Sequence, residues 1–416
     1  MVLLDDGFPG RLKADRVIVH PMDGRYLLEA LLAEQDERPR RRLHAAIART
    51  AHAIVGRAEP LGDALVIPYV DTASSMAGGS RHISGLPQAY YAVGLSRAAQ
   101  MLGDESLQAA GDRFFRALLI PVSDGGALYP DGGGPALAQV PTRPRDLILN
   151  GWLSMLVSVH RYAQLRDSEP ARELFAANLP TLRRLLPLYD VPQLRLSRYG
   201  LTGPLQLRLE MSMPGVRITD LRVALPGEGD VRLLLSDGGR WTPRIHAQDV
   251  ARRSETRGRE TVTIAGEVVH VTTVLTRAGY PEPNHLRMRI ASRAGLRLRT
   301  SAHIGRYDPA ASSTVEREWV QLRSTRVAPG SHAVEIELPY RPIELFAYPT
   351  HFTPGPDGGR VNAYHGTHIV RLRELADITG DPEFSAWAER WAGYVGEWPD
   401  RPELEGGTCW TPEGEL

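Results

Sequence analysis

The chain has 416 residues, of which 49 are basic and 49 acidic, so its formal net charge is zero. At about 100–200 residues per domain this length allows two or three domains, and the balanced charge argues against a protein that works by neutralising nucleic-acid phosphates. Cys409 is the one cysteine of the chain, which excludes an intramolecular disulfide and a multi-cysteine metal site. Lys13 is the one lysine, which disfavours catalysis by a lysine side chain.

The N-terminal sequence MVLLDDGFPGRLKADR lacks a basic stretch followed by an apolar one, so it does not resemble a secretory signal. The chain also has no apolar run of the ~18 residues that a membrane-spanning helix needs. We therefore expect a cytoplasmic bacterial protein without a membrane span.

Between Arg25 and about Leu186 the apolar residues recur at helical spacing. Short linkers such as Gly103-Asp104 separate neighbouring segments, as they do in helical hairpins. An array of such hairpins predicts a solenoid or a closed α/α toroid. The expected helices cover residues 26–34, 41–55, 88–102, 106–119, 147–165 and 171–186.

From about Leu205 to Pro342 the pattern changes to short alternating segments, which are separated by clusters of Gly, Pro or Asp. Such a series without a strong helix in it predicts an antiparallel β-sandwich. The expected strands cover residues 205–213, 216–225, 230–235, 261–275, 285–291, 296–304, 319–326 and 332–338.

Helical spacing returns at 361–379 and 382–395, joined by a Gly380-Asp381 turn that repeats the earlier Gly103-Asp104 linker. We therefore predict an α+β multidomain chain, in which an α/α toroid-like domain of helical hairpins is interrupted by an inserted antiparallel β-sandwich. The last two helices would pack back onto the first part, with 361–379 against 147–165. The predicted boundaries are 1–204 for the first helical part, 205–350 for the β domain and 351–416 for the last helical part.

Two polar segments interrupt this apolar pattern. Asn150 precedes Gly151 in an apolar helix, where it is either a satisfied core asparagine or a functional residue. His365 and His368 lie three residues apart at the start of a helix and so on one face of it. They form a structural pair, a polar patch that faces a substrate, or two ligands of a metal ion. Because the nearest acidic residue on that helix is Glu374, we expect neither a metal nor another cofactor.

Four stretches of the chain occur in a fixed order: Leu149-Asn150-Gly151, LLPLYD at 185–190, SRYGL at 197–201 and YHGTH at 364–368. Each resembles a signature of the D-glucuronyl C5-epimerase family. In that family the C-terminal helical domain carries L-N-G, then L-P-x-Y-D-T-G, then S-x-Y-D-L and finally Y-H-x-x-H. Gly200 stands in place of the aspartate of S-x-Y-D-L. The resemblance covers roughly residues 85–203 and 361–396 and does not account for the strands between them.

The resemblance implies the family's reaction, which converts glucuronate to iduronate in heparosan-type polysaccharides by removing and returning the proton at C5. Two proton-transferring groups must flank the sugar ring, and a cation must stabilise the enolate-like intermediate. By their motif positions Tyr364 and Tyr199 are the expected catalytic residues, whereas outside the motif each would be a buried tyrosine with a bonded hydroxyl. The expected substrate-binding residues are His365, His368, Asn150, Gln88, Arg143 and Arg198, with Arg145 as a further candidate cation.

The chain departs from the family's pattern next to these motifs. The family has Y-E-E-Y-P before L-N-G, but this chain has Gln139 and Val140 in place of the glutamate and the second tyrosine. The family has an arginine after S-x-Y-D-L, but Thr202 stands here. Because neither glutamine nor valine exchanges a proton near neutral pH, an active enzyme would need a rearranged set of acids and bases.

We therefore expect an isomerase, a uronic-acid C5-epimerase-like enzyme that acts on a glucuronate-containing polysaccharide or glycoside. The alternatives are a non-catalytic glycan-binding protein on an eroded epimerase fold and a uronate polysaccharide lyase, which abstracts the same proton but eliminates the C4 substituent. The expected partner is a uronic-acid-containing glycan rather than a nucleic acid, and a homodimer is the assembly to test.

Overall fold

The computed structural model describes residues 2–13, 16–38, 40–70, 81–130, 133–142, 145–225, 228–236, 243–276, 283–308, 313–338, 349–355, 358–411 and 414–415. Their contacts divide the chain into two compact units. The first contains residues 1–141 and 150–184, and the second contains residues 142–149 and 185–416. Within the described residues no helix is long and apolar enough to cross a membrane.

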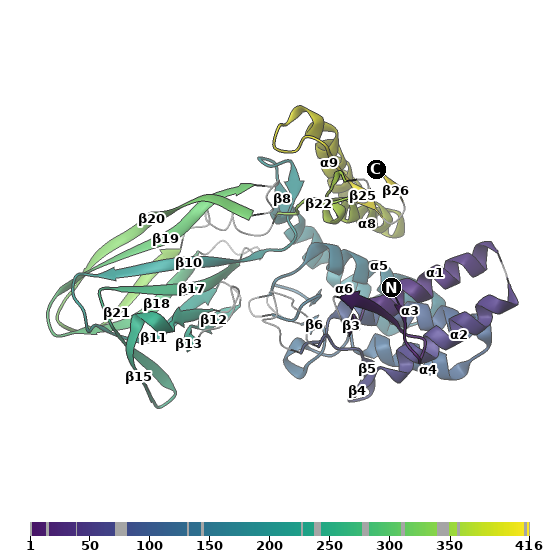
Figure 1. The fold of residues 1–416 in the computed structure, drawn as a ribbon, viewed down its shortest axis with the longest axis horizontal. Helices are drawn as coiled ribbons and strands as arrows, with labels where there is room; N and C mark the ends of the chain where they lie inside the picture. Colours follow the sequence, from purple (N-terminus) through teal and green to yellow (C-terminus); the bar gives the residue numbers. More distant parts are fainter. Residues whose placement is uncertain are drawn as a thin grey trace. The chain divides into compact units, whose positions relative to one another are not determined.

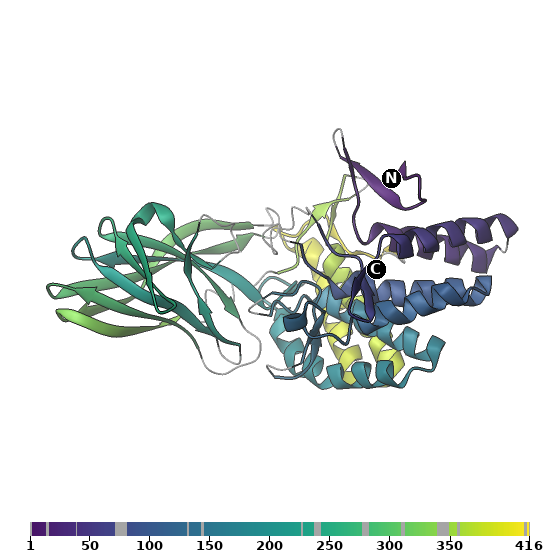
Figure 2. The same ribbon diagram turned by 90° about the horizontal axis from the view of Figure 1, so that it is seen from below.

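The first unit is built mainly from helix pairs, and the members of the first two pairs contact one another (Figures 1 and 2). Hydrogen bonds between side chains join the later helices: Trp152 donates its indole N–H to Asn178 Oδ1 at 2.9 Å, and Tyr162 donates its hydroxyl to Asp112 at 2.7 Å. The helices are α1 (Asp23–Glu37), α2 (Arg41–Gly56), α3 (Gly85–Leu102), α4 (Glu105–Arg116), α5 (Leu149–Arg166) and α6 (Glu169–Leu185).

Short strands accompany these helices, and the periodicity of the sequence did not predict them. Each has only two to five residues, too few for an apolar alternation to be recognised. The strands are β1 (Val2–Leu3), β2 (Pro9–Lys13), β3 (Arg16–Ile18), β4 (Glu59–Leu61), β5 (Ala64–Val66), β6 (Leu128–Tyr129) and β7 (Ala136–Leu137).

The second unit contains two six-stranded sheets (Figure 1). Apart from the parallel pair β13–β14, neighbouring strands in both sheets are antiparallel. One sheet has the order β13-β14-β17-β10-β19-β20, and the other has the order β15-β16-β11-β18-β21 with β12 beside β11. The strands are β10 (Thr202–Met211), β11 (Arg217–Leu225), β12 (Gly229–Arg232), β13 (Leu234–Ser236), β14 (Arg244–His246), β15 (Val250–Thr256), β16 (Arg259–Ile264), β17 (Val268–Thr276), β18 (Asn284–Ser292), β19 (Leu296–Asp308), β20 (Ser313–Val327) and β21 (Gly330–Leu338).

The two sheets share one hydrophobic core. Every second residue of β10 is buried in it, and so are alternate residues of β11 and β18. Because side chains alternate between the faces of a strand, the intervening polar residues lie on the outer faces. The core includes Leu205, Leu207, Leu209, Val223, Leu286 and Ile290.

The strand pattern differs from the expected one in three places. The segment 230–235, expected as one strand, contains β12 and β13, which belong to different sheets. The segment 261–275, expected as one strand, is divided into β16 and β17 by a turn at 265–267. The strands β14 and β15 were not expected. β15 lies at the edge of its sheet with almost all of its side chains exposed, so it lacks the apolar alternation that identifies a half-buried strand.

Two helices follow the strands in the second unit, α8 (Ala363–Thr379) and α9 (Pro382–Glu397). The joint between them repeats the joint between α3 and α4. Gly103 and Gly380 both adopt left-handed backbone conformations, with φ of 68° and 67°. Asp104 and Asp381 each accept a hydrogen bond from the backbone N–H two residues later, both at 2.9 Å. A left-handed glycine ends a helix and an aspartate caps the next, so the expected similarity of the two joints is confirmed.

Helices α8 and α9 both contact the hairpin of β8 (Asp190–Val191) and β9 (Leu196–Ser197), which follows α6 in the sequence. Asp190 accepts hydrogen bonds from Trp391 Nε1 at 3.1 Å and from the Tyr394 hydroxyl at 2.9 Å, and it pairs with Arg390 at 2.8 Å. Segments before and after the strands β10–β21 therefore meet at this hairpin. The packing of 361–379 against 147–165, the predicted domain boundaries, and the toroid and sandwich classes stay predictions.

Candidate active site

The two expected catalytic tyrosines lie in contact. Tyr199 follows β9 and is buried, whereas Tyr364 is the second residue of α8 and is half-buried. Their ring centroids are 4.7 Å apart in an edge-on arrangement, with 62° between the ring planes. The His351 ring lies 5.7 Å from Tyr364. The segment after β9 thus meets residues 351–364, more than 150 positions later, through aromatic rings.

The two expected histidines share one hydrogen-bond partner. Ser197 Oγ lies 2.8 Å from His365 Nδ1 and 2.7 Å from His368 Nδ1. The backbone N–H of Ser197 donates to His365 Nδ1 at 3.1 Å, and His365 Nε2 lies 3.1 Å from the Trp391 carbonyl oxygen. Because Nδ1 must accept, His365 carries its proton on Nε2 and donates it to Trp391. Both nitrogens of His365 are therefore occupied.

Burial keeps both imidazoles neutral. Both side chains are fully buried, and desolvation lowers the pKa of His365 to about 4 and that of His368 well below its usual 6.5. Neither ring is a cation near neutral pH, so neither can attract a carboxylate by charge. His368 Nε2 is buried without a hydrogen-bond partner in the described residues. Within those residues no three His, Cys, Asp or Glu side chains are arranged to hold a metal ion.

The start of α8 is fixed by buried polar groups. Asn362 caps the helix, because its side-chain oxygen accepts the backbone N–H of His365 at 3.1 Å. Its amide group donates to Thr350 Oγ1 at 3.1 Å, and Thr350 in turn donates both its backbone N–H and its hydroxyl to the Ser197 carbonyl oxygen. This network holds β9, Thr350 and the first turn of α8 together, and so determines the positions of both tyrosines.

Asp146 is a buried carboxyl beside Tyr199 that the sequence motifs did not identify. Residues 146–149 run beside residues 199–201: the Leu149 N–H donates to the Tyr199 carbonyl oxygen at 2.9 Å, and the Leu201 N–H donates to the Asp146 carbonyl oxygen at 3.0 Å. The Asp146 side chain occupies the space that a side chain at Gly200 would need, since its Cγ lies 3.3 Å from an ideal Cβ there. The carboxyl thus reaches the motif position of the family's aspartate from another part of the chain.

The environment of Asp146 favours the protonated carboxyl. Desolvation raises its pKa to about 7, against a usual value of 3.8, and its Oδ1 atom is buried without a hydrogen-bond partner in the described residues. A carboxyl with such a pKa can both donate and accept a proton near neutral pH. No spacing in the sequence could have revealed this, because the effect arises from burial against a glycine 54 positions later.

The candidate arginines differ in their surroundings. Arg145 forms a buried ion pair with Glu228 at 2.5 Å. Arg198 is buried and donates from Nε to the Leu188 carbonyl oxygen at 3.0 Å. Arg143 lies outside the described residues.

The remaining expected site residues belong to the first unit. Gln88 is fully buried, and its amide bonds the backbone N–H of Ile67 at 3.1 Å and the carbonyl oxygens of Ile67 and Ser84. Its amide therefore holds the backbone together, and a contact with substrate stays a prediction. Asn150 Oδ1 and Gln139 Oε1 are buried without hydrogen-bond partners in the described residues, and Gln139 fills the space beside Gly151 that a side chain there would need.

Comparison with known proteins agrees with the motifs. Residues 71–206 match the family described as D-glucuronyl C5-epimerase C-terminus. The D-glucuronyl C5-epimerase of Caenorhabditis elegans is 29% identical over 119 residues, a match that spans 26% of this chain and 19% of that protein. The family match includes Tyr199 but ends within β10, before the other strands of the two six-stranded sheets and before Tyr364. Over residues 71–206 the chain is therefore similar to the C-terminal part of D-glucuronyl C5-epimerases, as its motifs indicated.

Proposed function

We propose that this protein is a uronic-acid C5-epimerase-like enzyme that acts on a glucuronate-containing polysaccharide or glycoside. The observation that carries the proposal is the contact between Tyr199 and Tyr364, because the two residues lie 165 positions apart and belong to separate motifs. The match of residues 71–206 to the epimerase family supports the same class of reaction.

The geometry limits how the two tyrosines can act. A sugar ring stacked between two aromatic rings would hold them roughly 7–8 Å apart, which is twice a ~3.5–4 Å contact distance. The centroids of Tyr199 and Tyr364 are only 4.7 Å apart, so no sugar ring lies between them. The pair therefore acts through its hydroxyls from one side of the substrate, where one phenol exchanges the C5 proton.

A second proton-transferring group is needed, because epimerisation removes a proton from one face of C5 and returns one to the other. In our proposal this group is Asp146, which lies beside Tyr199 and has a pKa of about 7 and an Oδ1 atom without a partner in the described residues. It would supply an acid and base function that neither Gln139 nor Val140 can supply. Arg198 supplies the positive charge for the enolate-like intermediate.

Within the first unit, Asn150 and Gln139 are candidate groups for binding a sugar hydroxyl. Their side-chain oxygens are buried acceptors without donors in the described residues, a costly state that a sugar hydroxyl would relieve. An amide binds a hydroxyl without exchanging a proton, which suits a glutamine at a position where the family has a glutamate.

The decisive experiment is deuterium incorporation at C5. The full-length protein is incubated in heavy water with heparosan and with other uronate polymers, and the products are examined by NMR spectroscopy. An epimerase introduces deuterium at C5 and produces both epimers. New ultraviolet absorbance from an unsaturated product would instead identify a lyase. No incorporation with any of the polymers would contradict the proposal.

A second candidate function is glycan binding without catalysis, which the residues Gln139 and Val140 favour because neither can act as an acid or base. Tight binding of a uronate polymer together with no exchange at C5 would identify this function. Loss of binding in Asn150→Ala would then locate the glycan in the first unit.

A further inference from the structure

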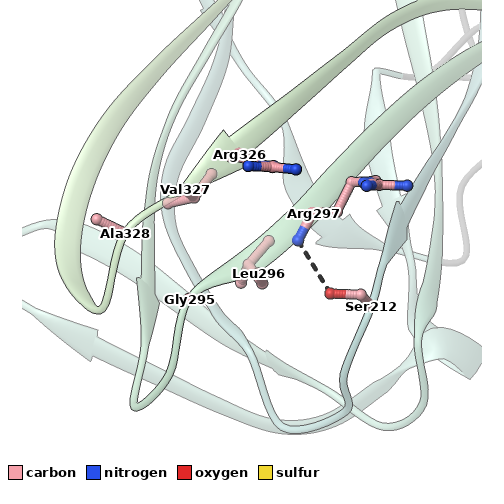
Figure 3. A pocket seen from close by; sticks show the side chains of 7 residues that line it. All are labelled: Ser212, Gly295, Leu296, Arg297, Arg326, Val327 and Ala328. Atoms are coloured by element: carbon pink, nitrogen blue, oxygen red, sulfur yellow. Dashed lines mark hydrogen bonds between the residues drawn. The ribbon is translucent and has the colours of Figure 1, made fainter.

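An open cavity of about 620 Å³ lies beside the start of β19 and the end of β20 (Figure 3). Arg297 and Arg326 line it from the two strands, and Figure 3 shows both side chains extending toward the same side. Leu296 and Val327 also line it, and Ser212 contributes a hydroxyl. The backbone N–H of Arg297 donates to that hydroxyl oxygen at 2.9 Å, which leaves the hydroxyl hydrogen available to a ligand.

The two arginines face each other without compensation. Arg297 and Arg326 are directly opposite in the register of β19 and β20, where like charges destabilise a sheet. In the described part of the chain neither guanidinium has a hydrogen-bond or ion-pair partner. Each presents forked donors that match a carboxylate or a sulfate. The pair is therefore suited to an anion that enters the cavity mouth.

Further arginines lie along the same strands, on the solvent-facing side of the sheet that carries Arg297 and Arg326. Leu296 and Leu298 are buried in the core, so Arg297 and Arg299 lie on the opposite, solvent-facing side of β19. On the neighbouring β10, Arg208 is also on the outer face. Glu210 is the acidic residue between them, with Arg208 at 3.3 Å and Arg299 at 3.7 Å, and it neutralises only part of their charge.

An aromatic residue ends this row. Trp319 on β20 is opposite His303 on β19, and their rings stack at 4.7 Å with 20° between the planes. The Arg208 guanidinium lies 4.9 Å from the centre of the Trp319 ring, in a cation–π contact. His303 Nδ1 is 3.2 Å from Gln206 Oε1. From Arg297 to His303 the row is about 20 Å long, at ~3.4 Å per residue of strand.

We propose that this outer face of β10, β19 and β20 binds an acidic polysaccharide, with a carboxylate or sulfate of the chain held between Arg297 and Arg326. The row of alternating cations, hydrogen-bonding groups and one large aromatic ring fits a chain that carries an anionic group on regularly spaced sugars. The binding site is separate from the tyrosine pair and requires no turnover, so it goes beyond the proposed enzymatic function. It would hold a long polymer while one of its sugars is processed elsewhere.

The test measures binding of a fluorescein-labelled heparosan polymer to the full-length protein by fluorescence anisotropy at low salt. The double variant Arg297→Gln/Arg326→Gln should bind roughly tenfold more weakly, because it loses two charge-assisted contacts. Trp319→Ala should also bind more weakly. The control Arg217→Gln/Arg289→Gln removes the same charge from exposed positions of β11 and β18 in the other sheet and should bind like the wild type.

Further probes distinguish the anion. Comparing the affinities for heparin and heparosan shows whether the site prefers a sulfate or a carboxylate. Binding of both polymers should weaken as added salt screens the charges. The proposal would be overturned if the wild type, the test variants and the control bound the polymer with equal affinity. It would also be overturned if the protein bound single-stranded DNA tightly but bound neither heparosan nor heparin. Deuterium exchange on a short uronate oligosaccharide is measured in parallel. If the double variant loses polymer binding while no protein shows exchange, the binding site stands and the enzymatic proposal fails.

Discussion

Tyr364 is the residue through which the proposed chemistry is most directly tested. Tyr364→Phe removes the hydroxyl but keeps the ring that contacts Tyr199 and His351. As a proton-transferring group it should contribute ~10²–10⁴-fold to turnover, so exchange at C5 should fall by that factor. The melting temperature should change little, because one lost hydrogen bond costs about 0.5–1.5 kcal/mol. Full exchange activity in this variant would end the proposed catalytic role.

Asp146 should make stability depend on pH in an unusual direction. Its pKa is about 7 in the folded protein and near 3.8 in the unfolded chain, so the folded state binds more protons between these values. The contribution of Asp146 to the free energy of unfolding should therefore fall as the pH rises through this window and change no further above it. Asp146→Asn cannot titrate and so removes this loss of stability with rising pH. In urea denaturation the free energy of unfolding of the variant, relative to that of the wild type, should increase from about pH 4 to pH 8. A difference between the two proteins that is the same at every pH would contradict the pKa shift of Asp146.

His365 should have the opposite effect. Its pKa of about 4 in the folded protein lies below the usual 6.5, so the unfolded chain binds more protons between these values. The histidine therefore stabilises the fold above pH 6.5, and this contribution should be lost as the pH falls toward 4. His365→Asn keeps an acceptor near the Ser197 N–H but cannot titrate. The wild type should lose stability relative to this variant between those two pH values, and parallel curves would exclude a buried neutral histidine.

For individual residues, the sequence identified the two tyrosines but not the residues that surround or support them. The motifs brought Tyr199 and Tyr364 to attention because each has a recognisable flanking pattern. Asp146 has none, since its importance depends on burial against Gly200. Likewise, the sequence could not tell that the amide of Gln88 is occupied by the backbone of Ile67 and Ser84. Contacts across long separations determine both roles.

The hairpin of β8 and β9 holds helix α9 in place, because Asp190 in the hairpin binds three side chains of α9. Asp190→Ala would leave the buried Trp391 indole and the Tyr394 hydroxyl without this acceptor. We expect a loss of about 2–4 kcal/mol in unfolding free energy. Arg390→Ala is the matched control, because it removes only a largely exposed ion pair and should cost less than ~1 kcal/mol. Similar losses in the two variants would show that the buried bonds contribute little.

Elements with complete local signals were predictable. The joints of α3–α4 and α8–α9 each combine a left-handed glycine with a capping aspartate, and both were expected from the Gly-Asp pairs. The strands of the hydrophobic core were predictable because they alternate. β15 was not, because an exposed edge strand depends on backbone pairing with β16, to which its side chains contribute no apolar pattern.

For the whole molecule, two compact units should unfold separately. Leu207→Ala opens a cavity in the core shared by the two sheets, and Leu153→Ala does so in the first unit. Each should cost about 2–5 kcal/mol. In differential scanning calorimetry the two variants should each lower the temperature of a different transition. A single transition that both variants lower equally would mean that the units unfold as one.

The close approach of Asp146 to Gly200 has a consequence for substitutions at these two positions. The Asp146 carboxyl fills the space that a side chain at Gly200 would need. Gly200→Asp alone would therefore force two carboxyls into one volume, whereas Gly200→Asp combined with Asp146→Gly would place one carboxyl there. The effects of substitutions at 146 and 200 should thus not add, because the two positions share one space.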